Sequence, residues 1–416
     1  MGTYGDELWN VTQLTSTQLG RLILPVPAPT LATDARAFLQ AVLNAARSLG
    51  GPGGDAPGPG AIVYLPPRVG DYVLRPVDRP SRDFIPAVGG ADLLVHPNVT
   101  LWFAPGAVLV LQPNVILRID GAIRTDARQI FRGIGTHSAI QRRGQVVFKS
   151  TKILEVYPEW WGALSTPDDQ ALSMPTDDTE ALLDCLKAAH TDRTFPDGFL
   201  PTLPIVLRGN YQIARELEVK PIGPPFGPPL DATQRTLFSG VPNATGLVLY
   251  GRRGPVTANQ GRPALEVGAT FRTPPTPARA LTGNALLRLE GLHGSIVEGV
   301  GFNAHGRADI CVQITGSNAR SSVFRGCSFI NARRVNFLAG DPPLEDMAED
   351  LPGEPALPLV SVGPSRFVRV ASRRINSGWD LSGLLLEDCV IENDESGDGV
   401  RGDARYELVG ILFHAN

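Results

Sequence analysis

Apolar and polar residues recur along the chain with two different spacings. The first is helical, because apolar residues recur every three or four positions after Thr33 and Asp34, either of which can cap a helix. These apolar residues are Phe38, Leu39, Val42, Leu43 and Ala46. The pattern predicts an amphipathic helix near the start of the chain, with its apolar side against a core.

The second spacing belongs to short strands separated by turn residues. With 45 Gly and 37 Pro in 416 residues, turns are frequent, and no long helix separates the apolar runs. This rhythm favours a sandwich or a solenoid. The strands expected in the first part of the chain are Ile62–Leu65, Tyr72–Leu74, Leu93–Val95, Val99–Phe103, Val108–Leu111 and Val115–Ile119.

The pattern of a helix followed by strands occurs twice. Residues 33–46 align without a gap with residues 176–189, and Gly70-Asp71-Tyr72 is matched by Gly209-Asn210-Tyr211. Each copy is therefore predicted to contain a capped helix, a short apolar strand, a turn and further strands. The second helix is expected to start at Asp177 or Asp178.

A shorter repeat follows farther along the chain. Residues 295–303 align with residues 322–330 and again with residues 385–393, and the segments share short strands, small turn residues and a recurring Asn. A repeat of roughly 20–30 residues with this content is typical of a parallel β-helix coil. A long insertion is expected between the last two copies, from Gly340 to about Trp379.

One segment resembles a known family. Residues 157–163 read Tyr-Pro-Glu-Trp-Trp-Gly-Ala, Asp177-Asp178-Thr179 opens the next helix, and Gly209-Asn210-Tyr211 follows the run Ile205–Leu207. This order is similar to the entry segment of the pectate-lyase-like superfamily, which includes rhamnogalacturonase-like and epimerase-like proteins and many phage tailspikes. The resemblance covers about residues 31–416. It implies a right-handed parallel β-helix, but no single activity, because the superfamily includes hydrolases, lyases, epimerases and inert spikes.

The expected fold is therefore all-β: a right-handed parallel β-helix, or solenoid, in two tandem units that each begin with a capping α-helix. Residues 1–30 are a lead-in, residues 31–156 form a first short unit, and residues 157–416 form the second. No closing element follows the strand expected at residues 409–413. The second unit is thus expected to be incomplete at its C-terminus, as in a piece of a longer protein.

Polar and aromatic residues beside the two helices are interpreted as structural. The end of a β-helix exposes strand edges and an open apolar core, and an amphipathic helix laid across that end shields both. Asp34, Asp177 and Asp178 are therefore predicted to be helix caps. Trp160 and Trp161 could stack on sugars, but their position next to the second helix favours packing.

Carboxylates are the candidates for catalysis. A glycosidase places one acid and one base or nucleophile across the scissile bond. The best local cluster lies at the end of the third copy of the short repeat and in the turn after it, and its candidate catalytic residues are Glu392, Asp394, Glu395 and Asp398. The alternative is a solvated acidic turn without paired geometry, which the absence of the polygalacturonase motifs Asn-Thr-Asp and Gly-His-Gly favours.

Arg325, Arg333 and Trp379 are the candidate substrate-binding residues. An arginine can hold the carboxylate of an acidic polysaccharide, although exposed arginines are also ordinary on a solenoid. The six His residues form no close pair, and the four Cys residues form no CxxC motif. No metal and no cofactor are therefore predicted, and the cysteines are expected to be buried free thiols.

Charge and hydropathy limit the partners. The 38 basic and 42 acidic residues are too balanced for a nucleic-acid-binding protein. No apolar run reaches the length of about 18 residues that a membrane-spanning helix requires. Residues 1–20 are polar and show no secretory signal. Localisation stays open, and association with a virion or a cell surface is favoured.

Two functions are open at this point. The first is a spike- or fibre-like protein that recognises a polysaccharide and is mainly a scaffold, and likeness to tailspikes implies a homotrimer or a larger assembly. The second is an enzyme, a polysaccharide hydrolase, lyase or epimerase that acts on an acidic glycan. The scaffold is the favoured hypothesis, because the catalytic signatures are not found.

Overall fold

The computed structural model describes part of the chain: residues 22–25, 34–49, 61–67, 71–76, 92–135, 143–165, 177–190, 202–219, 246–251, 269–273, 282–290, 292, 294–305, 307–315, 321–330, 332, 335–340, 366–371 and 384–392. These residues fall into two compact units. Unit 1 holds those up to Leu154 and Glu159–Gly162, and unit 2 holds Glu155–Pro158 and those from Ala163 onward. The predicted division into a first unit of residues 31–156 and a second of residues 157–416 stays a prediction.

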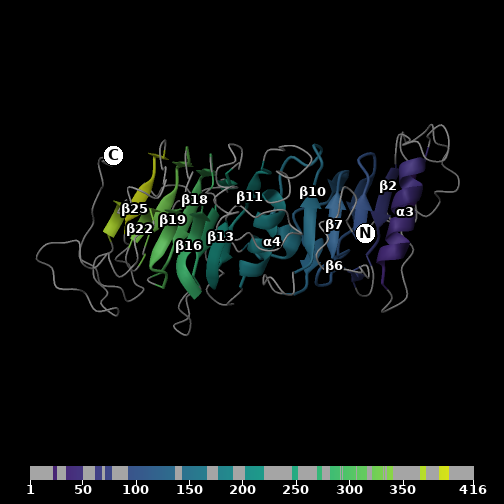
Figure 1. The fold of residues 1–416 in the computed structure, drawn as a ribbon, viewed down its shortest axis with the longest axis horizontal. Helices are drawn as coiled ribbons and strands as arrows, with labels where there is room; N and C mark the ends of the chain where they lie inside the picture. Colours follow the sequence, from purple (N-terminus) through teal and green to yellow (C-terminus); the bar gives the residue numbers. More distant parts are fainter. Residues whose placement is uncertain are drawn as a thin grey trace, which may run out of the picture. The chain divides into compact units, whose positions relative to one another are not determined.

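Unit 1 contains the helix α3 (Arg36–Ser48) and three parallel sheets (Figure 1). The first sheet has the order β1 (Leu22–Pro25), β2 (Ala61–Leu65), β5 (Thr100–Phe103) and β8 (Ala122–Arg124). The second has the order β3 (Tyr72–Leu74), β6 (Leu109–Leu111) and β9 (Phe131–Gly133). The third has the order β4 (Leu93–Val95), β7 (Ile116–Ile119) and β10 (Gln145–Phe148).

Unit 2 contains the helix α4 (Thr179–His190) and three five-stranded parallel sheets (Figure 1). The β11–β24 sheet has the order β11 (Ile205–Leu207), β14 (Val248–Gly251), β17 (Ile296–Glu298), β20 (Val323–Arg325) and β24 (Leu385–Glu387). The β12–β25 sheet has the order β12 (Asn210–Gln212), β15 (Ala269–Arg272), β18 (Val300–Asn303), β21 (Ser328–Ile330) and β25 (Val390–Glu392). The β13–β23 sheet has the order β13 (Arg215–Val219), β16 (Thr282–Glu290), β19 (Ile310–Thr315), β22 (Val335–Gly340) and β23 (Arg366–Ala371).

Consecutive strands along the chain belong to different sheets, so each coil of chain adds one strand to each sheet. Two exceptions occur among the described strands: β2 follows β1 and pairs with it in parallel, and β23 follows β22 and pairs with it in parallel. Part of the insertion expected between residues 340 and 379 is therefore a strand. The molecule consists mostly of strands in parallel sheets with few helices, consistent with the predicted parallel β-helix. Right-handedness and closure into a solenoid stay predictions.

The core of unit 1 is aromatic. The ring of Phe131 lies 5.7 Å from that of Phe103 and 5.5 Å from that of Trp161, measured between centroids. Phe148 contacts both Trp160 and Trp161. Each of these tryptophans, on the short 3-10 helix η2 (Pro158–Trp161), is only 6% exposed. Their predicted role in packing is confirmed.

The core of unit 2 contains a continuous aromatic stack. Tyr211, Phe271, Phe302 and Phe329 occupy the same position in successive strands of the β12–β25 sheet. Their ring centroids are 5.9, 5.6 and 5.5 Å apart along the sheet. All four rings are buried. In-register pairing thus places one aromatic ring on the next, an arrangement that is favourable beyond the burial of area.

Helix α3 covers a strand edge of unit 1. Its apolar side buries Leu39 and Leu43, and its polar side reaches β4, an edge strand of its sheet. The side-chain amide of Gln40 accepts a hydrogen bond from the Leu94 N–H at 2.9 Å and donates one to the Leu94 carbonyl at 3.3 Å. Gln40 therefore takes the place of a neighbouring strand for an edge that would otherwise lack one.

We predict that Phe302→Ala destabilises unit 2 by about 3–5 kcal/mol, because a fully buried ring in the middle of the stack leaves a cavity. Urea unfolding followed by circular dichroism measures the change. Phe302→Leu should cost less, because most of the buried apolar volume remains. Leu385→Ala, at a side chain that is 46% exposed, is the control and should change little. Equal losses for Phe302→Ala and Leu385→Ala would contradict the stack.

We also predict that acid weakens unit 1 through His96. Its Nε2 lies 2.9 Å from Asn44 Oδ1 on α3. Burial first, and then Arg47, hold the pKa of His96 below its ordinary value of 6.5, against the opposing effect of Asp120. A lowered folded-state pKa means that the unfolded chain binds the proton more tightly, so this stabilisation is present above pH 6.5 and is lost as pH falls through the folded pKa.

The test compares thermal unfolding of the wild type and of His96→Gln on both sides of pH 6.5. Gln keeps a donor for Asn44 but does not titrate, so the variant should lose less stability on acidification. If both proteins lose the same amount, His96 is not the group responsible.

Candidate functional site

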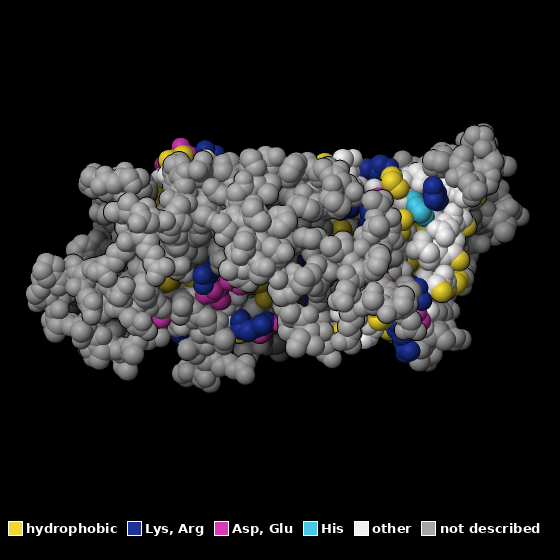
Figure 2. Space-filling view, viewed as in Figure 1, with side chains coloured by type: hydrophobic (Ala, Val, Ile, Leu, Met, Phe, Trp, Pro, Cys, Tyr) yellow, Lys and Arg dark blue, Asp and Glu magenta, His cyan; other side chains and the backbone are white. Residues whose placement is uncertain are grey.

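Charged side chains of both signs lie next to one another on the face of the molecule that Figure 2 shows. The described Lys and Arg side chains there form no separate block from the described Asp and Glu side chains. The described part of this face thus presents no block of a single charge that would attract a polyanion by its field. Binding at such a surface depends on which groups are neighbours.

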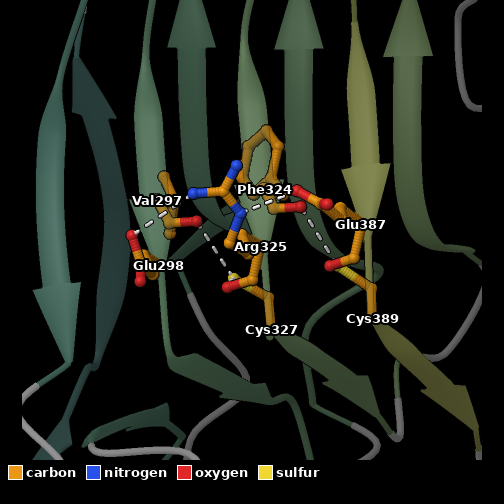
Figure 3. Close-up of polar contacts among 7 residues, drawn as sticks. All are labelled: Val297, Glu298, Phe324, Arg325, Cys327, Glu387 and Cys389. Carbon is orange, nitrogen blue, oxygen red and sulfur yellow. Dashed lines mark hydrogen bonds and ion pairs between the residues drawn. The ribbon is translucent and has the colours of Figure 1, made fainter.

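An exposed row of polar side chains crosses the β11–β24 sheet (Figure 3). In its strands the middle residues Leu249, Val297 and Phe324 are buried, so the residues that flank them point outward. One outward position is occupied, in successive strands, by Tyr250, Glu298, Arg325 and Glu387. We call these four residues the Arg325 row.

Arg325 lies between two carboxylates. Its Nε donates to Glu387 Oε2 at 2.7 Å, and its Nη1 is 3.9 Å from Glu298 Oε2 (Figure 3). The three side chains are between 43% and 51% exposed. The hydrogen bond that Arg325 donates to Glu387, followed by the charge of that carboxylate, raises the pKa of Arg325. Solvent screening makes such an exposed pair a weak contribution to stability.

A sharp corner follows three of the four strands of the row, β17, β20 and β24. Gly299, Gly326 and Asp388 occupy the same place in three successive coils and have φ angles of +65°, +57° and +51°. Gly adopts this left-handed conformation without strain, and Asp tolerates it better than most residues. The corner ends the strand at its outward charged residue, and the chain continues into the β12–β25 sheet.

The residues after two of these corners are cysteines, which point toward the preceding coil (Figure 3). Cys327 Sγ donates to the Val297 carbonyl and Cys389 Sγ to the Phe324 carbonyl, each at 3.4 Å. All four cysteines of the chain are free, and all but the half-buried Cys389 are buried. The hydrogen bond with Cys389 and burial raise the pKa of the Cys327 thiol. The predicted free thiols are thus confirmed, and Cys327 is no ready nucleophile.

Of the predicted site residues around this row, the structure describes Arg325 and the backbone of Glu392. Glu392 ends β25 and pairs with Ile330. It therefore belongs to the β12–β25 sheet, whereas Arg325 belongs to the β11–β24 sheet. The remaining candidates, Asp394, Glu395, Asp398, Arg333 and Trp379, lie outside the described residues.

Two of the predicted helix caps bond to the first backbone N–H groups of their helices. Asp34 Oδ1 accepts from Arg36 N at 3.0 Å and also from Arg75 N at 3.1 Å. Asp177 Oδ1 accepts from Thr179 N at 3.0 Å. Each carboxylate thus satisfies a helix N–H that has no partner inside the helix.

Asp178 makes a different set of contacts. Its carboxylate accepts from Leu164 N at 2.7 Å and from Gln212 N at 3.0 Å, and its own N–H donates to the Gln212 carbonyl at 2.8 Å. Gln212 belongs to β12, the edge strand of its sheet. Asp178 itself is only 3% exposed. Asp178 therefore joins the start of α4 to a strand edge, and its position is that of a structural group.

The glutamate partners of Arg325 were not among the residues predicted from the sequence. Part of the signal was present, because the alignment of residues 295–303 with residues 322–330 puts Glu298 and Arg325 at one repeat position. The alignment of the third copy, residues 385–393, was wrong by one residue: it places Asp388 against Arg325, whereas strand pairing places Glu387 there. Outward positions of aligned coils become neighbours when the coils pair in register. Alternation of opposite charges at one repeat position predicts an ion-paired row.

Metal ions and membranes are two other kinds of partner. In the part of the chain that the structure describes, no group of three or more His, Cys, Asp or Glu side chains is placed to hold a metal ion. None of the helices described there is both long and apolar enough to cross a membrane.

Comparison with known proteins gives little likeness. No protein-family model and no curated protein matches the chain. Among solved structures, the chain is similar to the A-modules of the mannuronan C-5 epimerases AlgE4 and AlgE6 of Azotobacter vinelandii. Each is 12% identical, with 90% of this chain and 96% of the module covered, and the TM-scores are 0.24 and 0.25. The likeness is weak, and the function has to be inferred from the geometry of this chain.

We predict that Asp178→Asn destabilises unit 2 by about 1–3 kcal/mol. One amide oxygen can replace one carboxylate oxygen, but the amide nitrogen would face a backbone N–H and leave it without an acceptor. Denaturant unfolding measures the loss, and the matched control is Asp177→Asn, because Asp177 is exposed and uses one oxygen for Thr179. Equal effects of the two substitutions would contradict the role given to Asp178.

Proposed function

We propose that this chain binds a polysaccharide on the outer face of the β11–β24 sheet, with the Arg325 row as the polar part of the surface. The observation that carries the proposal is the in-register row itself. It places one aromatic and three ionic side chains at a repeated spacing on an exposed sheet. Coils about 4.8 Å apart let an extended polymer repeat the same kind of contact.

An apolar row runs beside the Arg325 row. The other outward position of the same strands is occupied by Val248, Ile296, Val323 and Leu385. Leu385 is 46% exposed, and the other three are half-buried. A sugar ring presents hydroxyl groups at its edge and C–H groups on its faces, so a surface with adjacent polar and apolar rows matches both. Ligand sites commonly combine apolar lining with a few polar groups that fix orientation.

The charges of the row favour one class of glycan. Glu298 and Glu387 outnumber Arg325, and the guanidinium is already hydrogen-bonded to one of them. A carboxylate-rich glycan would be repelled here, whereas hydroxyl or amine groups can donate to the two carboxylates. A neutral or amine-bearing polysaccharide is therefore the proposed ligand of this row.

The same geometry favours binding over hydrolysis. A hydrolytic pair needs free space between its carboxylates for a scissile bond, and the guanidinium of Arg325 lies between Glu298 and Glu387. The enzyme alternative depends on Asp394, Glu395 and Asp398 and stays a prediction. The spike- or fibre-like role, the homotrimer and the surface location stay predictions as well.

The test is isothermal titration with dextran, chitosan oligosaccharides and polygalacturonate, using the wild type and Arg325→Gln. We expect dextran or the chitosan oligosaccharides to bind. Arg325→Gln should weaken the binding of dextran about tenfold, because the substitution removes a charged donor, whereas it should not weaken chitosan, whose ammonium groups then meet two uncompensated carboxylates. The matched control is Arg215→Gln, an arginine of unit 2 that is 42% exposed and paired with Glu180. Equal weakening of dextran binding by both substitutions, or failure of both dextran and chitosan to bind, would overturn the proposal.

A further inference from the structure

Unit 1 carries a second exposed row, on the outer face of its first sheet. In β2 and β5 the residues Val63 and Leu101 are buried at 0% and 3% exposure. The next residues, Tyr64 and Trp102, therefore point to the opposite side. Strand pairing aligns Tyr64 with Trp102, and Trp102 with Arg124 in β8. Tyr64 and Trp102 are half-buried, and Arg124 is exposed.

The three side chains are in contact with one another. The Tyr64 and Trp102 rings meet edge to face, with centroids 5.0 Å apart and an interplanar angle of 63°. The Cζ atom of Arg124 lies over the Trp102 ring, 4.4 Å from its centroid. A guanidinium that lies over an indole ring has its N–H donors at the edge of the guanidinium plane, where a ligand can reach them. Because Arg124 is already ordered by the Trp102 ring, it loses less conformational entropy when a ligand binds.

No carboxylate neutralises Arg124 among the residues that the structure describes. Its guanidinium contacts the Trp102 ring, and the acid two positions along, Asp126, pairs with Arg128 at 3.1 Å. Arg124 therefore differs from Arg325, which lies between two glutamates. An oriented and uncompensated guanidinium is suited to a carboxylate, which it can bind through two parallel hydrogen bonds.

We propose that Tyr64, Trp102 and Arg124 form a binding site for a carboxylate-bearing sugar of a polysaccharide. Arg124 binds the carboxylate, and the exposed parts of the two aromatic rings contact the sugar ring. A nucleic acid is the less favoured ligand, because the row offers a single cation, whereas affinity for a phosphate backbone comes from several. The site lies in unit 1 and does not rest on the proposed function of the Arg325 row.

The experiment titrates the full chain with trigalacturonate and with its methyl ester, which keeps the sugar shape and removes the charge. We expect the free acid to bind about tenfold more tightly than the ester, and Arg124→Gln to abolish that difference. Arg124→Lys should retain part of the preference for the free acid, because the charge remains while the bidentate hydrogen bonding is lost. Trp102→Leu should weaken both ligands.

Two matched variants test whether the binding belongs to this row of unit 1. Arg75→Gln changes an exposed arginine of the same unit whose backbone, rather than its side chain, bonds to Asp34. It should leave the binding of trigalacturonate unchanged, and so should Arg325→Gln. The proposal is overturned if acid and ester bind alike, if Arg124→Gln binds like the wild type, if Arg325→Gln abolishes binding, or if an oligothymidylate competes with trigalacturonate.

Discussion

The open edge of a parallel sheet is the constraint on which this structure depends. A sheet that grows by one strand per coil begins with a strand whose backbone groups lack a neighbour, and unsatisfied backbone groups are costly when they are buried. Both units meet this requirement with a helix. In unit 1 the amide of Gln40 bonds to both backbone groups of Leu94, and in unit 2 Asp178 bonds to both backbone groups of Gln212. Each helix thus presents polar groups in the positions where another strand would have them.

Once the first coil is closed in this way, register determines the rest of the surface and of the core. The pairing that aligns Phe302 with Phe329 also aligns Glu298 with Arg325, since both pairs belong to the same two coils. A slip by one residue would move the buried row to the outer face and the charged row into the core. The left-handed corner residues, such as Gly326, recur at one position of the repeat, so that consecutive coils turn at the same place and their strands stay in register. Core stability and surface chemistry are therefore linked through the same alignment.

The sequence predicts these elements well where the information is local. The strands Tyr72–Leu74 and Leu93–Val95 have the predicted bounds, because alternation and turn residues are visible within a few positions. The strand expected from Val99 begins one residue later, since the Val99 N–H closes a turn onto His96 instead. The strand β23 was not predicted, because it lies within an insertion and no repeat copy supports it. Contacts such as that between Trp102 and Arg124 depend on pairing between coils, which single-segment patterns do not contain.

The two arginine rows show how the chain can use one residue type for two kinds of chemistry. Arg325 and Arg124 both sit at the outward end of a short strand, and both are exposed. Their difference comes entirely from the neighbours one coil away. The neighbours of Arg325 are glutamates that compensate its charge, whereas Trp102 holds the guanidinium of Arg124 in place without compensating it. Because those neighbours are distant in sequence, a substitution in one coil changes the ligand preference of an arginine in the next. The specificity of such a surface is therefore encoded between coils rather than within any one of them.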